Sequence, residues 1–234
     1  MSAETDRLRM GETARAIQIP TGSVVLDGDL IVPLNADGLV IFAHGSGSSR
    51  RSPRNQFVAE LLRKAGLGTL LFDLLTSEEG ADDAIHGHLL FNIGLLTQRL
   101  VCAAHWAAEE DEARHLRIGL FGSSTGGGAG LVAAADLGAS IDAVVSRGGR
   151  PDLAGNALRR VKAPTLLIVG EQDEEVLELN EGAYEMLDCE KTLSIVRGAT
   201  HLFEEPGALE EVARLAAEWF LEHLRPFSGA RFTR

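Results

Sequence analysis

Six short apolar runs recur along this chain, and they constrain the fold more than any other feature of the sequence. They read GLVIFAHG, LGTLLFDLL, RIGLFG, IDAVVSRGG, APTLLIVGEQD and TLSIVRGATH. A continuous apolar run between turn residues is typical of a strand covered on both faces. Apolar residues at helical spacing fill most of the gaps, so strand and helix alternate almost to the end. This alternation predicts parallel strands joined by right-handed crossovers.

The remaining elements complete the predicted architecture. IQIP and SVVLDGDLIVP predict short antiparallel strands joined through Asp27-Gly28, a dipeptide that suits a tight hairpin turn. Helices are expected over 54–65, 88–107 and 204–224. PDLAGNALRRVK has room for one helix and for no inserted cap domain. The sequence therefore predicts a single domain over residues 1–234, with a three-layer α/β fold, a doubly wound and mostly parallel sheet, an N-terminal antiparallel hairpin and an open site.

Composition excludes several classes of protein. The 234 residues carry a net charge of −12 with the acids spread along the chain, so no cationic face is available for nucleic acid. No run approaches the roughly 18 uncharged apolar residues that a membrane span needs. The N-terminal stretch lacks the apolar core of a signal peptide, so we expect a cytoplasmic protein. Cys102 and Cys189 show no metal-ligand or redox spacing, and we expect two free thiols.

The stretch GLFGSSTGGGAG contains a G-x-S-x-G motif directly after an apolar run. Gly122, Ser124 and Gly126 occupy its fixed positions, which leaves Ser123 and Thr125 out of frame. Where a strand turns sharply into a helix, this motif holds a serine hydroxyl above the sheet edge with the helix N-terminus beneath it. We therefore predict Ser124 as a nucleophile.

A serine hydroxyl needs a base to act as a nucleophile near neutral pH. His201 follows the last predicted strand in VRGATHLFEEPG, and we predict that it accepts the proton. Asp173 follows the preceding strand in LLIVGEQDEEV, and we predict that it orients the imidazole. Glu171, Glu174 and Glu175 lie in the same acidic loop and are rivals for that role.

The loop HGSGSSRRSPRN follows another predicted strand and can supply an oxyanion hole. We predict that the backbone N–H groups of Ser46 and of Thr125, the residue after the nucleophile, bind the developing oxyanion. Gly47 is an alternative donor to Ser46. We expect His44 to brace this loop and not to carry protons.

Arginines follow two of the predicted strands. Arg50 lies in the loop after the first of them, and Arg147 and Arg150 follow another. Because a local positive patch on an acidic protein can recruit an anionic substrate, we predict these three arginines as substrate-binding residues. The alternative is that they pair with surface acids such as Asp152 or face solvent.

The segment SEEGADDAIHGH brings acids and two histidines together without a defined set of metal ligands. We interpret it as an acidic loop with a helix that begins after Asp83. The sequence therefore predicts no metal and no cofactor.

HGSGS, GSSTG, GEQD and ATHLFEEPG, in this order, resemble the α/β-hydrolase superfamily, and most closely its small capless members similar to dienelactone hydrolase. The resemblance covers nearly the whole chain. It implies a triad of Ser124, His201 and Asp173 that hydrolyses a small-molecule carboxylic ester, thioester or lactone through an acyl-enzyme. Dienelactone hydrolases carry a cysteine where Ser124 stands, so their particular substrate is not implied.

Two other functions stay open at this point. One is an acyltransferase that uses the same triad with an acceptor other than water. The other is a binding module that keeps the scaffold with weak catalysis, because a fold does not determine a function. The sequence leaves the oligomeric state undetermined.

Overall fold

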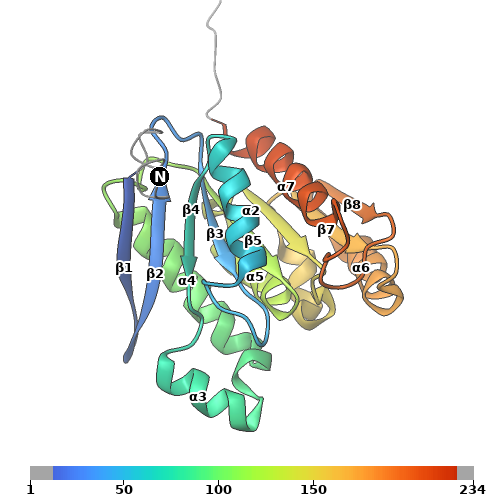
Figure 1. Ribbon diagram of the computed structural model, residues 1–234, viewed down its shortest axis with the longest axis horizontal. Helices are drawn as coiled ribbons and strands as arrows, with labels where there is room; N and C mark the ends of the chain where they lie inside the picture. Colours follow the sequence, from blue (N-terminus) through green and yellow to red (C-terminus); the bar gives the residue numbers. More distant parts are fainter. Residues whose placement is uncertain (1–12, 226–234) are drawn as a thin grey trace, which may run out of the picture.

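The computed structural model describes residues 13–225, in which eight strands form one sheet with helices on both faces (Figure 1). The strands are β1 (Thr13–Thr21), β2 (Val24–Val32), β3 (Leu39–Ala43), β4 (Gly68–Phe72), β5 (Ile118–Ser123), β6 (Ala143–Arg147), β7 (Thr165–Gly170) and β8 (Lys191–Val196). Their order in the sheet is β1-β2-β4-β3-β5-β6-β7-β8. The pairs β1/β2 and β2/β4 are antiparallel, and all other pairs are parallel. This arrangement confirms the predicted fold class.

Helices cover the two faces of the sheet. The longer helices are α2 (Pro53–Lys64), α3 (Ser77–His86), α4 (Ile93–Glu109), α5 (Thr125–Leu137), α6 (Glu174–Met186) and α7 (Ala208–Leu224), and short 3-10 turns are η1 (Leu89–Phe91), η2 (Gly138–Ser140) and η3 (Pro151–Arg160). Helices α2 and α7 pack together over one face, whereas α4, α5, η3 and α6 pack over the other. Helix α3 projects beyond the sheet edge at which β4 ends (Figure 1).

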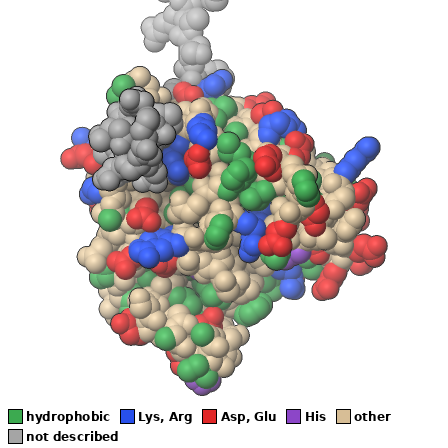
Figure 2. Space-filling view, viewed as in Figure 1, with side chains coloured by type: hydrophobic (Ala, Val, Ile, Leu, Met, Phe, Trp, Pro, Cys, Tyr) green, Lys and Arg blue, Asp and Glu red, His purple; other side chains and the backbone are tan. Residues whose placement is uncertain are grey.

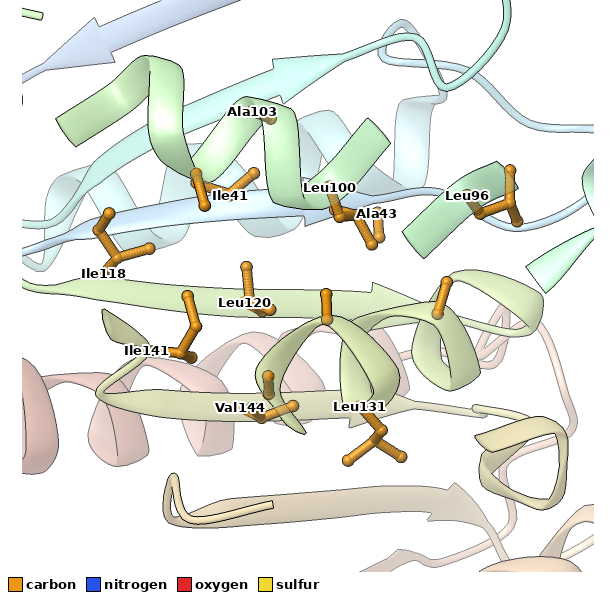
Figure 3. Close-up of a cluster of buried hydrophobic side chains, with 14 of the residues drawn as sticks. Ile41, Ala43, Leu96, Leu100, Ala103, Ile118, Leu120, Leu131, Ile141 and Val144 are labelled. Atoms are coloured by element: carbon orange, nitrogen blue, oxygen red, sulfur yellow. The ribbon is translucent and has the colours of Figure 1, made fainter. Parts of the chain in front are cut away.

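Alternate side chains of the central strand β5 point into two separate hydrophobic cores. Leu120 lies in the core beneath α4 and α5, where Leu100 and Leu131 also lie (Figure 3). Phe121 points to the opposite face, and its ring centre is 4.9 Å from that of Phe42 in the core beneath α2 and α7. Fully burying one such side chain stabilises the fold by about 1.5–3 kcal/mol, so the two cores hold the carboxyl ends of the central strands in fixed positions.

The hairpin turn lies five residues before the predicted one. Gly22, at φ 67°, turns the chain between β1 and β2, so the prediction of a turn at Asp27-Gly28 is wrong. Gly28 instead lies inside β2, opposite Ile17 of β1 and Phe72 of β4. A Cβ atom on Gly28 would lie 2.7 Å from Ile17 Cδ1, so this glycine serves close packing and not a turn.

The helix predicted to begin after Asp83 in fact begins at Ser77 and is α3. Thr76 and Glu79 form a reciprocal capping box, since Thr76 Oγ1 accepts the Glu79 N–H and the Glu79 carboxylate accepts the Thr76 N–H. This cap supplies partners for the first amide groups and so starts the helix early. The predicted helix over 88–107 is α4, which starts at Ile93 after a cap by Asn92.

The last predicted strand is only half covered. Strand β8 is at the edge of the sheet, and Ile195 on it is 47% exposed, so the prediction of burial on both faces is wrong for this strand. An edge strand has one neighbour, and its apolar run does not reveal this. Cys102 and Cys189 are free thiols, as predicted.

None of the helices within residues 13–225 has the length and apolar character needed to cross a bilayer. The predicted absence of a signal peptide concerns a stretch that lies mostly outside the described residues. The single domain over residues 1–234 stays a prediction for the same reason.

Candidate active site

Ser124 lies on the sharp turn between β5 and α5. Its φ of 50° and ψ of −123° belong to a region that residues with a side chain rarely adopt. The Ser124 N–H donates to the Arg147 carbonyl at 3.4 Å, and the Ser124 carbonyl accepts the N–H groups of Gly127 and Arg150, both at 3.0 Å. Ser124 is also the one residue over 118–131 that is not buried. The fold therefore holds a strained serine at the open edge of the sheet.

Two glycines bring the loop after β3 against this turn. A Cβ atom on Gly126 would lie 2.2 Å from the Ala43 carbonyl oxygen. A Cβ atom on Gly45 would lie 2.9 Å from Ser124 Cβ and 3.0 Å from the Ser123 carbonyl oxygen. Separations below 3.0 Å exclude a larger residue unless the backbone moves. The glycine-rich sequence thus lets the backbone of one loop touch the serine on another.

The two predicted oxyanion donors are chain neighbours of residues at the nucleophile turn: Ser46 follows Gly45, which packs against Ser124, and Thr125 follows Ser124. The Ser46 N–H has no acceptor within residues 13–225. Thr125 is the first residue of α5, where an amide N–H has no partner inside the helix and the helix dipole is positive. Both groups are therefore free to bind a negatively charged oxygen, and their catalytic role stays a prediction.

His44 fixes the loop that carries Ser46. Its Nε2 accepts the Leu74 N–H at 3.0 Å, so Nδ1 carries the ring proton and donates to the Gly45 carbonyl at 3.0 Å. Burial lowers the pKa of His44 and keeps the ring neutral. This geometry agrees with the predicted bracing role.

His201 and Asp173 meet at the ends of β8 and β7. The distance between His201 Nδ1 and Asp173 Oδ2 is 2.6 Å, with the Asp173 side chain 14% exposed and that of His201 38% exposed. The rivals of Asp173 lie elsewhere: Glu171 accepts the Gly198 N–H at 2.8 Å, and Glu174 and Glu175 are exposed. The predicted partner of His201 is therefore the one the structure brings to it.

Backbone contacts and one buried ring hold the His201 loop in place. The Gln172 N–H donates to the Ala199 carbonyl at 2.9 Å, which ties the loops after β7 and β8 together. Phe203 has a φ of 57°, and its ring is buried in the core beneath α2 and α7. The loop therefore has an anchor on each side of His201.

Ser124 and His201 lie on either side of the segment that ends β6. Arg147 accepts the Ser124 N–H, and a Cβ atom on the next residue, Gly148, would lie 3.5 Å from His201 Cε1. No hydrogen bond joins the Ser124 hydroxyl to the imidazole in the described part of the chain. In substrate-free sites this contact is often long and shortens when substrate binds.

A cleft of about 420 Å³ runs from the loop after β3 to the segment after β4. Its lining includes His44, Ser46, Asp73, Leu75, Leu90 and Phe91. This volume is in the range of small-molecule sites. Phe91 is 56% exposed, and hydrophobic side chains are visible on the projecting end of the molecule (Figure 2).

The segment around α3 and η1 lines the cleft. No role in the site was predicted for this segment from its sequence. One signal was available, because this segment follows the carboxyl end of β4, and all parallel strands of such a sheet place their site loops at that edge. Within residues 13–225 no group of three or more His, Cys, Asp or Glu side chains is placed to hold a metal ion.

Two of the three predicted substrate arginines have acidic partners. Arg50 pairs with Asp73 and, at 3.2 Å, with Asp29; burial opposes the charge of Arg50, but these carboxylates raise its pKa overall. Arg150 forms two hydrogen bonds to Asp152, both 2.8 Å long. Arg50 and Arg150 therefore follow the alternative prediction, in which the arginines pair with acids. That they bind substrate stays a prediction. Arg147 is different, because no carboxylate of the described residues lies within 4 Å of it.

Two solved structures share the fold of this chain. A dienelactone hydrolase from Anabaena variabilis is 56% identical, with a TM-score of 0.90 over 92% of this chain and 100% of that one. The protein Est1E from Butyrivibrio proteoclasticus has a TM-score of 0.74 at 20% identity over 88% of this chain and 98% of that one, which shows a shared fold.

Curated relatives and a family model give the remaining comparison. "Putative phosphoribosyl transferase Rv0571c" of Mycobacterium tuberculosis is 54% identical over 208 residues, which are 89% of this chain and 46% of that protein. The chain thus spans about half the length of the curated relatives it matches. A model of the Dienelactone hydrolase family matches residues 27–227. The chain belongs to the dienelactone hydrolase family.

Proposed function

We propose that the protein is a serine hydrolase that cleaves a carboxylic ester, thioester or lactone through an acyl-enzyme. One observation carries this proposal: the hydrogen-bonded pair His201–Asp173 lies at the same sheet edge as the strained turn that presents Ser124. Family membership supports hydrolysis in general.

The acylation step follows from the ring nitrogens of His201. Asp173 accepts a hydrogen bond from Nδ1, so Nε2 has a free lone pair. Ser124 Oγ attacks the carbonyl carbon of the substrate while its proton moves to Nε2. The negative charge that develops on the carbonyl oxygen is bound by the N–H groups of Ser46 and Thr125. The bond to the leaving group then breaks, and the leaving atom takes the proton from Nε2.

Hydrolysis of the acyl-enzyme by water completes the cycle. His201 accepts one proton from a water molecule, and the resulting hydroxide attacks the acyl carbon. The bond to Ser124 Oγ breaks, Oγ regains the proton from Nε2, and the carboxylic acid leaves. Each proton that His201 takes is returned, so the resting enzyme is restored without a cofactor.

The cleft supports a small substrate of mixed polarity. Its volume of about 420 Å³ begins at the Ser46 side of the site and ends at the apolar residues Leu90 and Phe91. The carbonyl group of a substrate would lie beside Ser124, and one apolar arm would extend toward Phe91.

Substitution of Ser124 tests the proposal directly. Ser124→Ala should abolish turnover of small activated esters such as p-nitrophenyl acetate and should abolish labelling by a fluorophosphonate probe. Ser140→Ala is the matched control, because Ser140 is exposed in η2, outside every site element described above. Labelling of Ser124→Ala at the level of the wild type would refute Ser124 as the nucleophile.

Product analysis separates hydrolysis from acyl transfer. With competing alcohols and thiols present, a hydrolase should still yield mainly the free acid. Predominant formation of the exchanged ester or thioester would instead identify an acyltransferase that uses the same residues.

A further inference from the structure

Arg147 is a buried cation without an acidic partner. It is 7% exposed, and its Nε atom is fully buried with no hydrogen-bond acceptor. Within residues 13–225 its side chain neither forms an ion pair nor donates a hydrogen bond. Burial, together with the charge of Arg54, lowers the pKa of Arg147 to about 10, which leaves it charged at neutral pH. A charge kept out of water in this way destabilises a fold unless something binds it.

Ser123 lies beside Arg147 and on the same face of the sheet. The two residues are register partners at the ends of β5 and β6. Two positions earlier, the partners Phe121 and Val145 both point into the core beneath α2 and α7, and side chains two apart share a face. Ser123 is also buried, and no acceptor or donor contacts its hydroxyl within the described chain. Two polar side chains with unused hydrogen bonds thus lie next to the nucleophile.

Two further groups border this position. The Phe203 ring centre is 5.7 Å from Arg147 Cζ, so the ring stacks against the guanidinium and leaves its N–H edge free. Arg54, at the start of α2, adds a second positive charge, and no acid occupies the first turn of that helix. Arg54 pairs at 2.8 Å with Glu204, a largely exposed residue. Glu204 pairs with Arg54 only, so the charge of Arg147 stays uncompensated and the position is electropositive.

We infer that Arg147 and Ser123, with Arg54 at the rim, bind a phosphate group carried by the substrate. The inference rests on the proposed function and names the substrate class of that site: an ester that also bears a phosphate monoester. The donors come from β5, β6 and α2, and a phosphate has three terminal oxygens to meet donors on three sides. A carboxylate has two oxygens, and a single arginine fork occupies both.

The backbone of Arg147 places the proposed phosphate site next to the nucleophile. Its carbonyl accepts the Ser124 N–H, and the next residue, Gly148, contacts the His201 loop. A substrate held at Arg147 by its phosphate would therefore lie beside Ser124 with its ester separated from the phosphate by a short linker. The cost of a buried, unpaired guanidinium is then offset when substrate binds.

Three matched butyrate esters test the assignment. They are the butyrates of 3-hydroxypropyl phosphate, of 4-hydroxybutanoate and of 3-methoxypropanol, which carry a phosphate, a carboxylate and a neutral group. We expect the highest kcat/KM for the phosphate ester. Arg147→Met should lower the ratio of phosphate to neutral kcat/KM by about 10- to 100-fold, the range for charge-assisted hydrogen bonds. Arg147→Lys should retain part of the preference.

The control is Arg160→Met, the same substitution at an exposed arginine that pairs with Asp136. It should leave the ratio at the wild-type value. A ratio that Arg147→Met does not change would overturn the inference, and a preference for the carboxylate ester would overturn the choice of phosphate.

Thermal unfolding gives a second readout that needs no turnover. Inorganic phosphate, compared with chloride at equal ionic strength, should raise the Tm of the wild type and not that of Arg147→Met. Without phosphate, Arg147→Met should have the higher Tm, because an apolar side chain replaces an unpaired buried charge. A lower Tm of this variant would show that Arg147 is structural and would overturn the inference.

The two readouts separate this inference from the proposed function. If Ser124→Ala retains ester cleavage while phosphate raises the Tm only when Arg147 is present, the function fails and the phosphate site stands. If cleavage depends on Ser124 but neither the ratio nor the Tm responds to Arg147→Met, the function stands and the phosphate site fails.

Discussion

The imidazole of His201 donates from Nδ1 to Oδ2 of Asp173 across 2.6 Å. Because a carboxylate only accepts, this bond fixes the tautomer of the neutral ring and directs its basic nitrogen away from Asp173. The same carboxylate can stabilise the imidazolium that forms when His201 takes a proton. Asp173 thus sets both the orientation and the tautomer of the imidazole that the proposed proton transfer from Ser124 requires.

Asp173→Asn should lower kcat by about 1,000- to 10,000-fold, because an amide can donate to Nδ1 and so favour the tautomer that is protonated at Nε2. The measurement is steady-state hydrolysis of p-nitrophenyl acetate, with circular dichroism to verify the fold. Glu171→Gln is the matched control, since Glu171 is in the same loop but binds the Gly198 N–H. A smaller loss for Asp173→Asn than for the control would contradict the role of Asp173.

Gly45→Ala should lower kcat about 100-fold or more, the cost of a misplaced oxyanion donor. The new Cβ atom would lie 2.9 Å from Ser124 Cβ, so the loop that carries Ser46 has to move. Kinetics with an activated ester measure the effect. Gly182→Ala in α6 is the control, because nothing lies within 4 Å of a Cβ there and α6 is outside the cleft. Wild-type kcat in Gly45→Ala would show that the loop backbone does not set the oxyanion hole.

Two glycines of α5 should respond in opposite ways to the same substitution. Gly130→Ala should stabilise the protein by about 0.5–1 kcal/mol, because alanine favours a helix and nothing within 4 Å obstructs its Cβ. Gly126→Ala should destabilise it by about 1–3 kcal/mol or more, because the Cβ would lie 2.2 Å from the Ala43 carbonyl oxygen. Urea denaturation measures both. Equal effects would refute close backbone packing at Gly126.

His44 should make the free energy of unfolding fall with falling pH. Burial lowers its pKa in the folded state below the usual 6.5, so the unfolded chain binds a proton that the folded chain does not. The stabilisation is complete above about pH 6.5 and is lost as the pH falls toward the folded-state pKa, by up to about 1.4 kcal/mol per pH unit.

The variant His44→Gln removes this titration while its amide can still accept the Leu74 N–H. Its free energy of unfolding should therefore depend less on pH between 7 and 5 than that of the wild type, as measured by urea denaturation. His115→Gln is the control, because His115 is exposed. A pH slope that is equal in the wild type and His44→Gln would contradict this account.

Hydrophobic patterning determined the fold class. The six apolar runs became β3 to β8, because parallel strands buried beneath helices need continuous apolar sequence. The order of the site motifs followed, since loops after parallel strands meet at one sheet edge. For this reason the sequence alone pointed to Ser124, Asp173 and His201, and the structure joins the last two by a hydrogen bond.

Local boundaries were less determined by the sequence. Asp27-Gly28 has the composition of a turn, but cross-strand packing of Gly28 against Ile17 and Phe72 keeps it inside β2. The early start of α3 depends on the Thr76 and Glu79 cap, which competes with the loop-like composition around it. In both places a few specific contacts outweigh residue preferences.

Only the tertiary structure decided which charges are paired. Arg50, Arg147 and Arg150 look alike in the sequence, each in or just before a loop at the same sheet edge. Folding gives Arg50 and Arg150 acidic neighbours. It buries the side chain of Arg147 beside Ser123, where no acidic side chain of the described residues pairs with it. The reason is that patterning fixes the face on which a side chain lies, whereas ion pairs depend on distances of a few ångströms between elements far apart in the chain.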